Sequence, residues 1–468
     1  MKTQFTFVFL LFISTMLHAQ LKSYRQLPEI PLSDLFQVEI RQGKSAWQAV
    51  FTYSLPVTER VLVTKNEHIA MFGFEPATGP VEIKVSSKTG NELNDKNIEL
   101  VNKTLKDVAV TFTSGVMLIR LTNPKTQLFV RLKNDPGNPL NIFADPVKDS
   151  PIPANAKVFR FKASDKPYVQ TAEYDRFTVP NDVDVVYIED GALIKGTIHT
   201  AKDRTRPLKL MGQGMVIGNG GILHGPANIP FNAVVITKGI GNSIEGITVM
   251  KSRHFSMDIG EKGHIDNVKL FGYAYNNDGF VAGDSSLIEN SFLKVNDDHI
   301  KLYHDDVIVR NCIFYVQTNG AVFQFAWNRI DPGDRCLVEN CEVVACEFEN
   351  CGDPVQGEGG LAHCFVSLRE AQEEGKLLDG CTIRNILIQG QLQRFIGLNG
   401  YTYKGVTVND LKLENITVEN EPKKQSWIYT KDANPMEVTF KNVSFGKRRI
   451  NKDDIKTIGD VKLNFVPR

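Results

Sequence analysis

The sequence has no excess of charge of either sign: its 468 residues contain 54 lysines and arginines and 54 aspartates and glutamates. Nucleic-acid-binding proteins normally show a basic excess, so the composition argues against that class. After residue 19 the chain also lacks an apolar run near the ~20 residues that span a bilayer. The hydrophobic fraction of 42% is nevertheless sufficient for a buried core, and the chain is not of the disordered type.

The first 19 residues have the pattern of a secretory signal. A basic start at Met1-Lys2 precedes a mostly apolar run over residues 5–17, and Leu17-His18-Ala19 is a suitable cleavage site. A membrane anchor is the alternative, but the apolar run is too short to span a bilayer. The sequence therefore predicts a secreted or periplasmic protein whose mature chain begins near Gln20.

Metal-ligand spacing is missing from the seven cysteines. They form no CxxC pair and no Cys/His pattern of the kind that binds zinc, so buried structural thiols or disulfides are the expectation. An odd count in an exported chain leaves at least one free thiol or an intermolecular pair. The cysteines are Cys312, Cys336, Cys341, Cys346, Cys351, Cys364 and Cys381.

Residues 20–150 are predicted to form a β-sandwich domain. Apolar and polar residues alternate over 36–40, 81–85, 108–112 and 128–132, which indicates antiparallel strands with one wet face. Three prolines between residues 146 and 153 then mark a domain boundary near 150–157.

Residues 151–468 carry an internal repeat in which an apolar strand precedes Asn, Asp or Gly and another apolar strand follows. These three residue types tolerate a left-handed backbone best, so each repeat is predicted to turn a sharp corner there. The early repeats are 21 to 29 residues apart, which is typical of a right-handed parallel β-helix. Helix signal is almost absent, and residues 367–378 are the clearest candidate. The predicted corners are Gly246, Asn267, Asn290, Asn311, Asn340, Asn385, Asp410 and Asn442.

Carboxylates recur at matching distances from these corners. Asp278 lies eleven residues after one corner, while Asp297 and Asp298 lie seven and eight residues after the next. Because coils stack about 4.8 Å apart, the three side chains are expected to converge on one surface cleft. Consecutive aspartates are more often solvated turns, and Asp305-Asp306, at the end of a coil, is interpreted in that way.

Two neighbouring carboxyl groups can cleave a glycosidic bond. One protonates the leaving oxygen, and the other attacks the sugar at a separation of ~5–5.5 Å or activates water at ~6.5–9.5 Å. One coil of rise permits either mechanism, and any lateral offset favours the longer separation. Repulsion between the neighbouring carboxylates would raise the pKa of one of them, and that group would then be the protonated acid. Calcium binding is a third interpretation of clustered acidic oxygens.

The segments Asn276-Asn277-Asp278-Gly279 and Asn296-Asp297-Asp298-His299-Ile300-Lys301, behind a β-sandwich, resemble glycoside hydrolase family 49. This family of dextranases and isopullulanase shares a clan of inverting enzymes with the polygalacturonase-like family 28. The resemblance implies that Asp297 is the general acid and that Asp278 or Asp298 activates water. It extends through Lys301 to the segment that ends at Trp327, and it implies no metal or organic cofactor.

Departures from family 28 argue against a galacturonate substrate. Its enzymes have Gly-His-Gly where this chain has Thr318-Asn319-Gly320, and no Arg-Ile-Lys follows. The resemblance to family 49 implies dextran as the expected substrate, although the matched residues do not fix the linkage. Further candidates for substrate binding are His254, Asn276, Lys301, Tyr303, Asn319, Gln324 and Trp327.

Two other classes of function remain open from the sequence. A β-helix polysaccharide lyase would use calcium and a lysine or arginine base. A non-catalytic solenoid would bind a glycan without cleaving it. The main hypothesis is a polysaccharide hydrolase with no nucleic-acid partner and no membrane span.

Overall fold

The computed structural model describes residues 21–57, 62–147, 150–169, 176–218, 234–252, 255–327, 330–347, 363–369, 375–400 and 404–467. The predicted signal therefore lies outside the described residues, as do His254 and Cys351. No helix in these ranges is long and apolar enough to cross a membrane. The described helical turns are η1 (Pro76–Thr78) and η2 (Lys452–Asp454).

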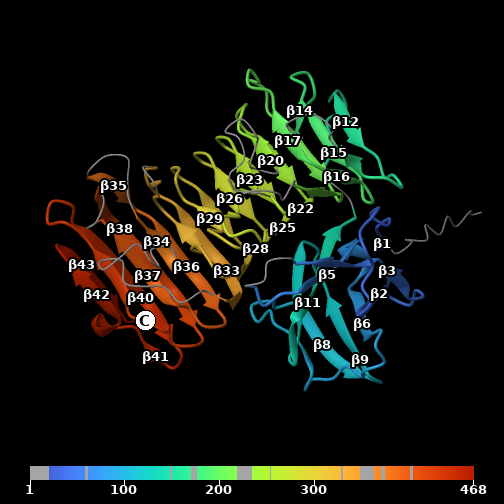
Figure 1. Cartoon of the computed structure of the whole chain (residues 1–468), viewed down its shortest axis with the longest axis horizontal. Coiled ribbons are helices and arrows are strands. Elements are labelled where there is room, and N and C mark those ends of the chain that lie inside the picture. The colour runs from blue at the N-terminus through green and yellow to red at the C-terminus, as the bar shows by residue number, and fades with distance from the viewer. Residues whose placement is uncertain are drawn as a thin grey trace, which may run out of the picture.

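A β-sandwich forms the N-terminal part of the molecule and packs beside the middle of a solenoid (Figure 1). Its first sheet contains β1 (Leu21–Ser23), β4 (Thr52–Pro56), β5 (Asn66–Phe74), β7 (Ile98–Leu100), β10 (Thr126–Leu132) and β11 (Asp135–Pro146). Its second sheet contains β2 (Phe36–Gln42), β3 (Gln48–Val50), β6 (Val81–Ser87), β8 (Val108–Thr113) and β9 (Val116–Leu121). The pairs are antiparallel except β5 with β11, which is parallel.

The first sheet of the sandwich is buried on both faces, whereas one wet face was predicted. Leu128 and Val130 of β10 point into the sandwich core, while Phe129 points the other way into a cluster with Phe271 and Phe292 of the solenoid. The prediction of a wet face is therefore wrong for residues 128–132, because the solenoid covers that face. In the second sheet, β2 and β6 keep the predicted alternation.

The solenoid is a parallel β-helix, as the repeat predicts. Two of its sides are built from β12 (Val158–Phe161), β13 (Tyr168–Val169), β15 (Val185–Ile188), β16 (Leu193–Lys195), β18 (Lys209–Gly212), β19 (Met215–Ile217), β21 (Ser243–Glu245), β22 (Thr248–Met250), β24 (His264–Asp266), β25 (Lys269–Phe271), β27 (Leu287–Glu289), β28 (Phe292–Val295), β30 (Ile308–Arg310), β31 (Ile313–Val316), β33 (Leu337–Cys346), β35 (Lys376–Asp379), β36 (Thr382–Ile388), β38 (Val406–Val418), β40 (Met436–Phe445), β41 (Arg448–Arg449) and β43 (Val461–Val466).

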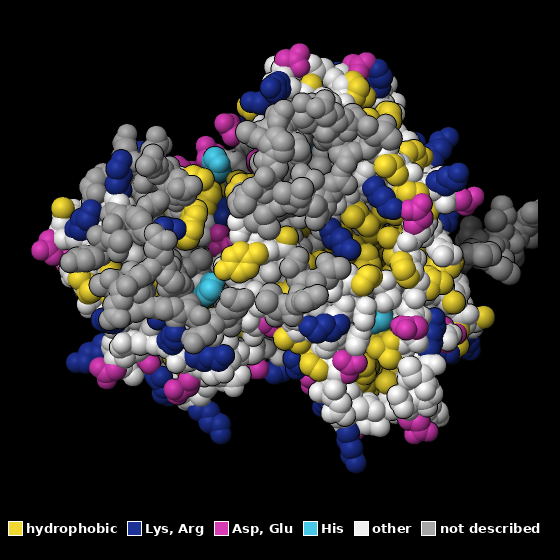
Figure 2. All heavy atoms as spheres, in the orientation of Figure 1, with side chains coloured by type: hydrophobic (Ala, Val, Ile, Leu, Met, Phe, Trp, Pro, Cys, Tyr) yellow, Lys and Arg dark blue, Asp and Glu magenta, His cyan; other side chains and the backbone are white. Residues whose placement is uncertain are grey.

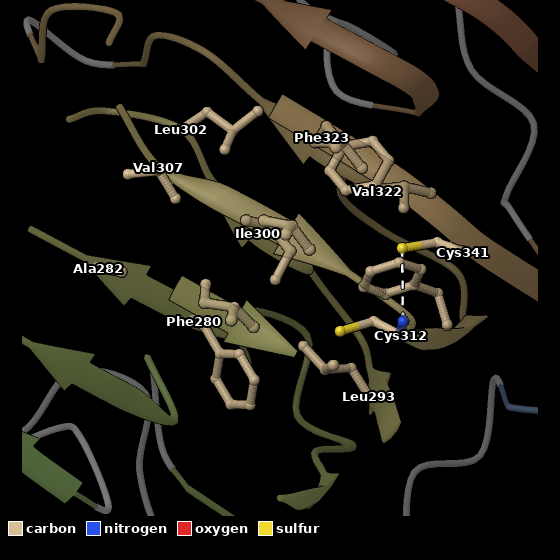
Figure 3. Close-up of a cluster of buried hydrophobic side chains, with 14 of the residues drawn as sticks. Phe280, Ala282, Leu293, Ile300, Leu302, Val307, Cys312, Val322, Phe323 and Cys341 are labelled. Atoms are coloured by element: carbon tan, nitrogen blue, oxygen red, sulfur yellow. Dashed lines mark hydrogen bonds between the residues drawn. The ribbon is translucent and has the colours of Figure 1, made fainter. Parts of the chain in front are cut away.

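The third side of the solenoid is a separate sheet, which we call the cleft sheet. Its strands are β14 (Arg176–Val179), β17 (Thr197–Thr200), β20 (Val234–Ile236), β23 (Met257–Ile259), β26 (Phe280–Ala282), β29 (Ile300–Lys301), β32 (Phe323–Gln324), β34 (Cys364–Leu368), β37 (Arg394–Asn399), β39 (Ser426–Tyr429) and β42 (Ile455–Ile458). Inward side chains such as Phe280, Ile300 and Phe323 fill the interior of the coils (Figure 3).

All eight predicted corner residues have a positive φ. Most of them stack as a ladder of asparagine side chains, for example from Asn385 Nδ2 to Asn340 Oδ1 at 3.1 Å. Asp410 is the exception, because the ladder continues instead through Asn415, whose Nδ2 donates to Asn385 Oδ1 at 3.1 Å. Asp410 lies at a second corner of the same strand, β38, so its predicted place in the repeat is wrong.

The predicted helix over 367–378 is wrong where the structure describes it. Ser367 and Leu368 belong to β34, which is hydrogen-bonded between β32 and β37, and residues 376–378 belong to β35. Residues 370–374 lie outside the described ranges. Neighbouring strands on both sides of β34 outweigh the local helix signal of this segment.

Of the six described cysteines, all but Cys346 are buried. Cys312 and Cys341 stack in adjacent coils, where the Cys312 backbone N–H donates to Cys341 Sγ at 3.4 Å (Figure 3). Cys336 and Cys381 repeat this arrangement at 3.3 Å. These four thiols are buried, in agreement with one of the two expectations from the sequence.

Candidate active site

Register within the cleft sheet sets the position of the site. Phe280 pairs with Ile300, and Ile300 with Phe323, so their outward neighbours Lys301 and Gln324 lie on adjacent coils. Adjacent parallel strands are ~4.8 Å apart, which is within reach of one long side chain. Polar groups on this outer face can therefore act together although they are distant in sequence.

The three predicted aspartates lie together at the entrance to these strands. The Gly279 N–H donates to the Asp298 carbonyl at 2.8 Å, which stacks the segment of Asp278 on that of Asp297 and Asp298. One carboxylate oxygen of each aspartate lies within 4.8 Å of those of the other two. This distance is shorter than the separation that the sequence favoured, because the two segments stack with little lateral offset.

Two glycines allow this close approach. A Cβ at Gly279 would lie 2.0 Å from the His299 carbonyl oxygen, and a Cβ at Gly320 would lie 2.2 Å from the Asp297 carbonyl carbon. Gly320 also has a φ of +77°. Any side chain at either position would push the coils apart at the carboxylates.

Lys301 bridges two of the carboxylates. Its Nζ lies 2.7 Å from Asp278 Oδ1 and 2.7 Å from Asp298 Oδ2. Burial opposes the charge of this ammonium, but attraction from Asp278 and Asp298 outweighs burial and holds the pKa of Lys301 well above its usual value. The lysine is therefore a fixed cation and cannot act as a base at neutral pH.

The carboxyl groups differ in how easily they ionise. Burial raises the pKa of Asp278 to about 7, with Lys301 opposing this shift and Asp298 adding to it. Burial, followed by the charges of Asp278 and Asp298, raises the pKa of Asp297 well above its usual value. Asp297 is thus held as the neutral acid beside two groups that share the lysine.

Asp297 is oriented by two hydrogen bonds. The Asp298 N–H donates to Asp297 Oδ1 at 2.9 Å, and Asn319 Nδ2 donates to Asp297 Oδ2 at 2.9 Å. On Asp298, Oδ1 accepts from the Ala321 N–H at 2.7 Å. Every carboxylate oxygen in these contacts has a defined donor, so the side chains cannot rotate freely.

A cleft of about 360 Å³ lies over these groups, and the described residues that line it all belong to the solenoid. Every described residue of the predicted catalytic and substrate-binding set lines the cleft; His254 lies outside the described residues. Sequence reasoning missed Phe255, Tyr275 and Ile330, although the first two lie beside predicted residues. The lining residues are Phe255, Tyr275, Asn276, Asp278, Asp297, Asp298, Lys301, Tyr303, Asn319, Gln324, Trp327 and Ile330.

Further contacts join residues in and around the cleft. Tyr303 OH donates to Gln324 Oε1, which also accepts from Lys301 Nζ at 3.2 Å. The guanidinium of Arg369 lies 4.2 Å from the ring centroid of Trp327.

The carboxylates could in principle hold a metal ion, because their oxygens are close enough to share one. Lys301 Nζ, however, already lies 2.7 Å from an oxygen of each of Asp278 and Asp298. A divalent ion between these oxygens would be repelled by the ammonium at contact distance. The arrangement therefore fits a lysine-neutralised acid cluster better than a calcium site.

No known family model matches the chain. A dextranase from Arthrobacter globiformis is 25% identical over 189 residues, which are 36% of this chain and 29% of that enzyme. An isopullulanase from Aspergillus niger is 22% identical over 201 residues, which are 38% of this chain and 35% of that enzyme. These matches span about a third of the length of the curated relatives, and they confirm the resemblance that the sequence motifs indicate.

The solved structure of Dex49A from Penicillium minioluteum has the same fold. It matches this chain with a TM-score of 0.77 over 92% of both chains, at 14% sequence identity. The match includes the sandwich and the solenoid, because it covers nearly the whole of each chain.

Proposed function

We propose that this protein is a glycoside hydrolase that cleaves an α-glucan such as dextran by a single displacement with inversion. Asp297 donates a proton to the glycosidic oxygen, and Asp278 or Asp298 deprotonates the attacking water. The observation that carries the proposal is the asymmetry of the cluster. One carboxyl group is held neutral, while the other two share the ammonium of Lys301.

Lys301 opposes the rise that burial causes in the pKa of Asp278, and so favours the ionised form that a base requires. Without a counter-charge, two adjacent carboxylates would both be shifted toward the neutral acid. The same lysine argues against a lyase, which needs a neutral lysine or an arginine to remove a proton. Here the pKa of Lys301 is raised, and the lysine is bound by the acids themselves.

Inversion is proposed although the carboxylate oxygens are close. Both Lys301-bound carboxylates are engaged by donors, since Oδ1 and Oδ2 of Asp298 accept from Ala321 and Lys301. Asp278 Oδ1 likewise pairs with Lys301 Nζ. Inversion is therefore proposed from the resemblance to the inverting family 49 and not from the separation of the oxygens. The configuration of the freshly released sugar, followed by NMR, tests this step, and retention would identify one of the two carboxylates as a nucleophile instead.

The cleft suits a neutral sugar. Lys301 is the only cationic side chain among the described residues that line it, and that charge is already neutralised by two carboxylates. A uronate would meet a cluster of three acids whose one cation among the described lining residues is already engaged. Phe255, Tyr275 and Trp327 offer aromatic faces against which the apolar face of a sugar ring can pack. The dextranase and isopullulanase relatives support an α-glucan.

The test is the release of reducing ends from dextran. We expect release by the wild-type protein and none by Asp297→Asn, because the amide cannot donate the acid proton. Asp305→Asn is the matched control, since this exposed aspartate pairs with Arg335 away from the cleft, and it is expected to keep full activity. Wild-type-like activity in Asp297→Asn would refute the assignment, provided that both variants unfold at the wild-type temperature.

Inactivity of the wild type on dextran would refute the α-1,6 linkage alone, and other α-glucans would then be tried. Glycan binding without cleavage of any of them would favour the non-catalytic alternative. We also propose, from the signal pattern at residues 1–19, that the protein acts outside the cytoplasm.

A further inference from the structure

A buried histidine lies behind the cleft wall without lining the cleft. His363 is 8% exposed and comes from the segment that leads into β34, one coil beyond Asn319. Its Nε2 lies 2.9 Å from Asn319 Oδ1. Because an amide oxygen only accepts hydrogen bonds, His363 must carry its proton on Nε2 to make this contact.

The amide of Asn319 has three partners that fix its orientation. Its Nδ2 donates to Asp297 Oδ2 and to the Tyr275 carbonyl, both at 2.9 Å. Reversal of the amide would place its oxygen against these two acceptors and its NH₂ against the His363 N–H. The histidine is thus the donor that fixes the amide oxygen, and the amide in turn orients the catalytic acid.

We infer that His363 is a positioning residue for the reaction proposed above, acting on Asp297 through the side-chain amide of Asn319. The inference rests on the proposed function of Asp297 as the acid, and it adds a residue that does not contact the cleft. When Asp297 gives up its proton, a carboxylate remains beside Asp278 and Asp298. The NH₂ of Asn319 is a donor already aimed at that developing charge.

The charged groups near Asp297 and near His363 determine which of these two side chains is expected to titrate. Asp297 faces Asp278, Asp298 and Lys301. Burial lowers the pKa of His363, with Asp298 opposing this shift and Arg394 and Lys424 adding to it. The imidazole is therefore neutral near pH 7. Both the neutral Nε2–H form and the protonated form of His363 donate to Asn319. A change of rate with pH is therefore expected from titration of the aspartate cluster and not from titration of His363.

The sign of the effect on Asp297 follows from the hydrogen bond. A donor to a carboxylate stabilises the charged form and lowers its pKa. Loss of the ordered Asn319 donor would raise the pKa of Asp297 further. The alkaline limb of the rate profile, where the acid loses its proton, would then move to higher pH, while the rate at the optimum falls because proton donation becomes harder.

The experiment compares His363→Phe with His363→Gln. Phenylalanine fills the space without a donor, whereas the glutamine amide can again donate to Asn319 Oδ1. For His363→Phe we expect kcat to fall about 10-fold, KM to stay within about two-fold, and the alkaline limb to rise by up to about one pH unit, the size of one charge-assisted hydrogen bond. His363→Gln is expected to recover most of kcat and the wild-type limb.

A double-mutant cycle separates positioning from packing. On an Asn319→Ala background, His363→Phe is expected to change kcat no further, because the side-chain amide through which His363 acts is already absent. An equal loss on both backgrounds, or a lower kcat with an unmoved limb, would overturn the inference in favour of a packing role.

A second readout does not depend on turnover. In protein labelled with ¹³C at the aspartate carboxyls, the Asp297 signal, assigned by its absence in Asp297→Asn, is expected to titrate at higher pH in His363→Phe than in the wild type. An unchanged titration would refute the inference. If no glucan is cleaved at all, the proposed function fails, and this titration still decides whether His363 acts on Asp297.

Discussion

Lys301 is the residue on which the charge balance of the cleft depends. Its ammonium lowers the pKa of Asp278 against the effect of burial, so removal of the charge would leave two buried carboxylates without a cation. Each unpaired acid would then favour its neutral form, which can neither activate water nor interact well with a positively charged transition state.

We therefore expect Lys301→Met to lower kcat about 100-fold or more and to move the acidic limb of kcat/KM to higher pH. The base is active only when ionised, so a higher pKa makes the rate fall at a higher pH as the solution is acidified. The measurement is the pH profile of glucan cleavage. Lys195→Met, which removes a surface partner of Glu29, is the control and is expected to leave the profile unchanged. An unmoved acidic limb in Lys301→Met would contradict this role.

Among single residues, the sequence predicted the three candidate aspartates but not the histidine that we infer to position one of them. Asp278, Asp297 and Asp298 could be located because each lies at a countable distance from an asparagine corner, and stacked coils convert equal counts into proximity. His363 could not be found in that way. The insertion after β33 breaks the count between Asn340 and β34, so no spacing relates His363 to Asn319.

The asparagine ladder is the element that keeps coils in register. Its members have a left-handed backbone, and side-chain amides donate to the oxygen of the asparagine one coil before, as from Asn442 to Asn415 at 2.9 Å. The ladder thus combines a corner that few residues tolerate with a hydrogen bond that specifies which coils are neighbours.

Asn385 allows these two contributions to be separated, because its side chain is exposed and bonded on both sides. Asn385→Ala loses the ladder bonds and also strains the backbone by ~1–2 kcal/mol at a φ of +57°. Asn385→Gly loses the bonds but adopts this φ freely. We expect both variants to unfold at lower temperature than the wild type, with Ala lower than Gly. Equal melting temperatures would show that the backbone conformation contributes little.

The period of the ladder was predictable from the sequence, but one of its members was not. β38 contains two left-handed corners, at Asp410 and Asn415, and the residues around both alternate in the same way. Only pairing with β36, which aligns Glu414 with Arg384, shows that Asn415 continues the ladder. Local sequence cannot distinguish two corners of one strand.

The whole molecule depends on the contact between sandwich and solenoid. This contact buries two ion pairs, Lys269 with Asp145 and Lys294 with Glu67, and both members of each pair are almost fully excluded from solvent. Aromatic side chains surround them, with Phe143 against both Phe271 and Phe292. On the outer face shown in Figure 2, by contrast, acidic and basic side chains are interspersed over the exposed surface.

Single removal of one partner is expected to destabilise the protein strongly. Lys294→Met leaves Glu67 buried without its cation, which typically costs ~3–5 kcal/mol of unfolding free energy. The double variant Glu67→Gln/Lys294→Met has no buried charge at this point, and we expect it to recover most of that loss. Chemical denaturation of Lys294→Met, Glu67→Gln and the double variant measures the coupling. Additive effects of the two substitutions would contradict the pairing.

The sequence predicted the β-sandwich, but it did not predict the contact of its first sheet with the solenoid. Phe129 and Phe143 alternate with polar or core residues in a way that any half-buried strand would show, so the sequence does not reveal that a second core covers them. The apolar contact of the sandwich with the solenoid runs along the coils from Leu193 to Ala345.

Stacked coils give this chain something like a reading frame. The side chains that enter the interior and those that face the cleft are decided by parity along each short strand, as Ile300 and Lys301 show. Deletion of a single residue between Asn290 and Asp297 would exchange these two directions and send the acids into the core. A whole coil, or a loop inserted between two strands, leaves the frame unchanged. Variation that preserves catalysis is therefore expected to enter this fold in complete turns or between strands, and rarely one residue at a time.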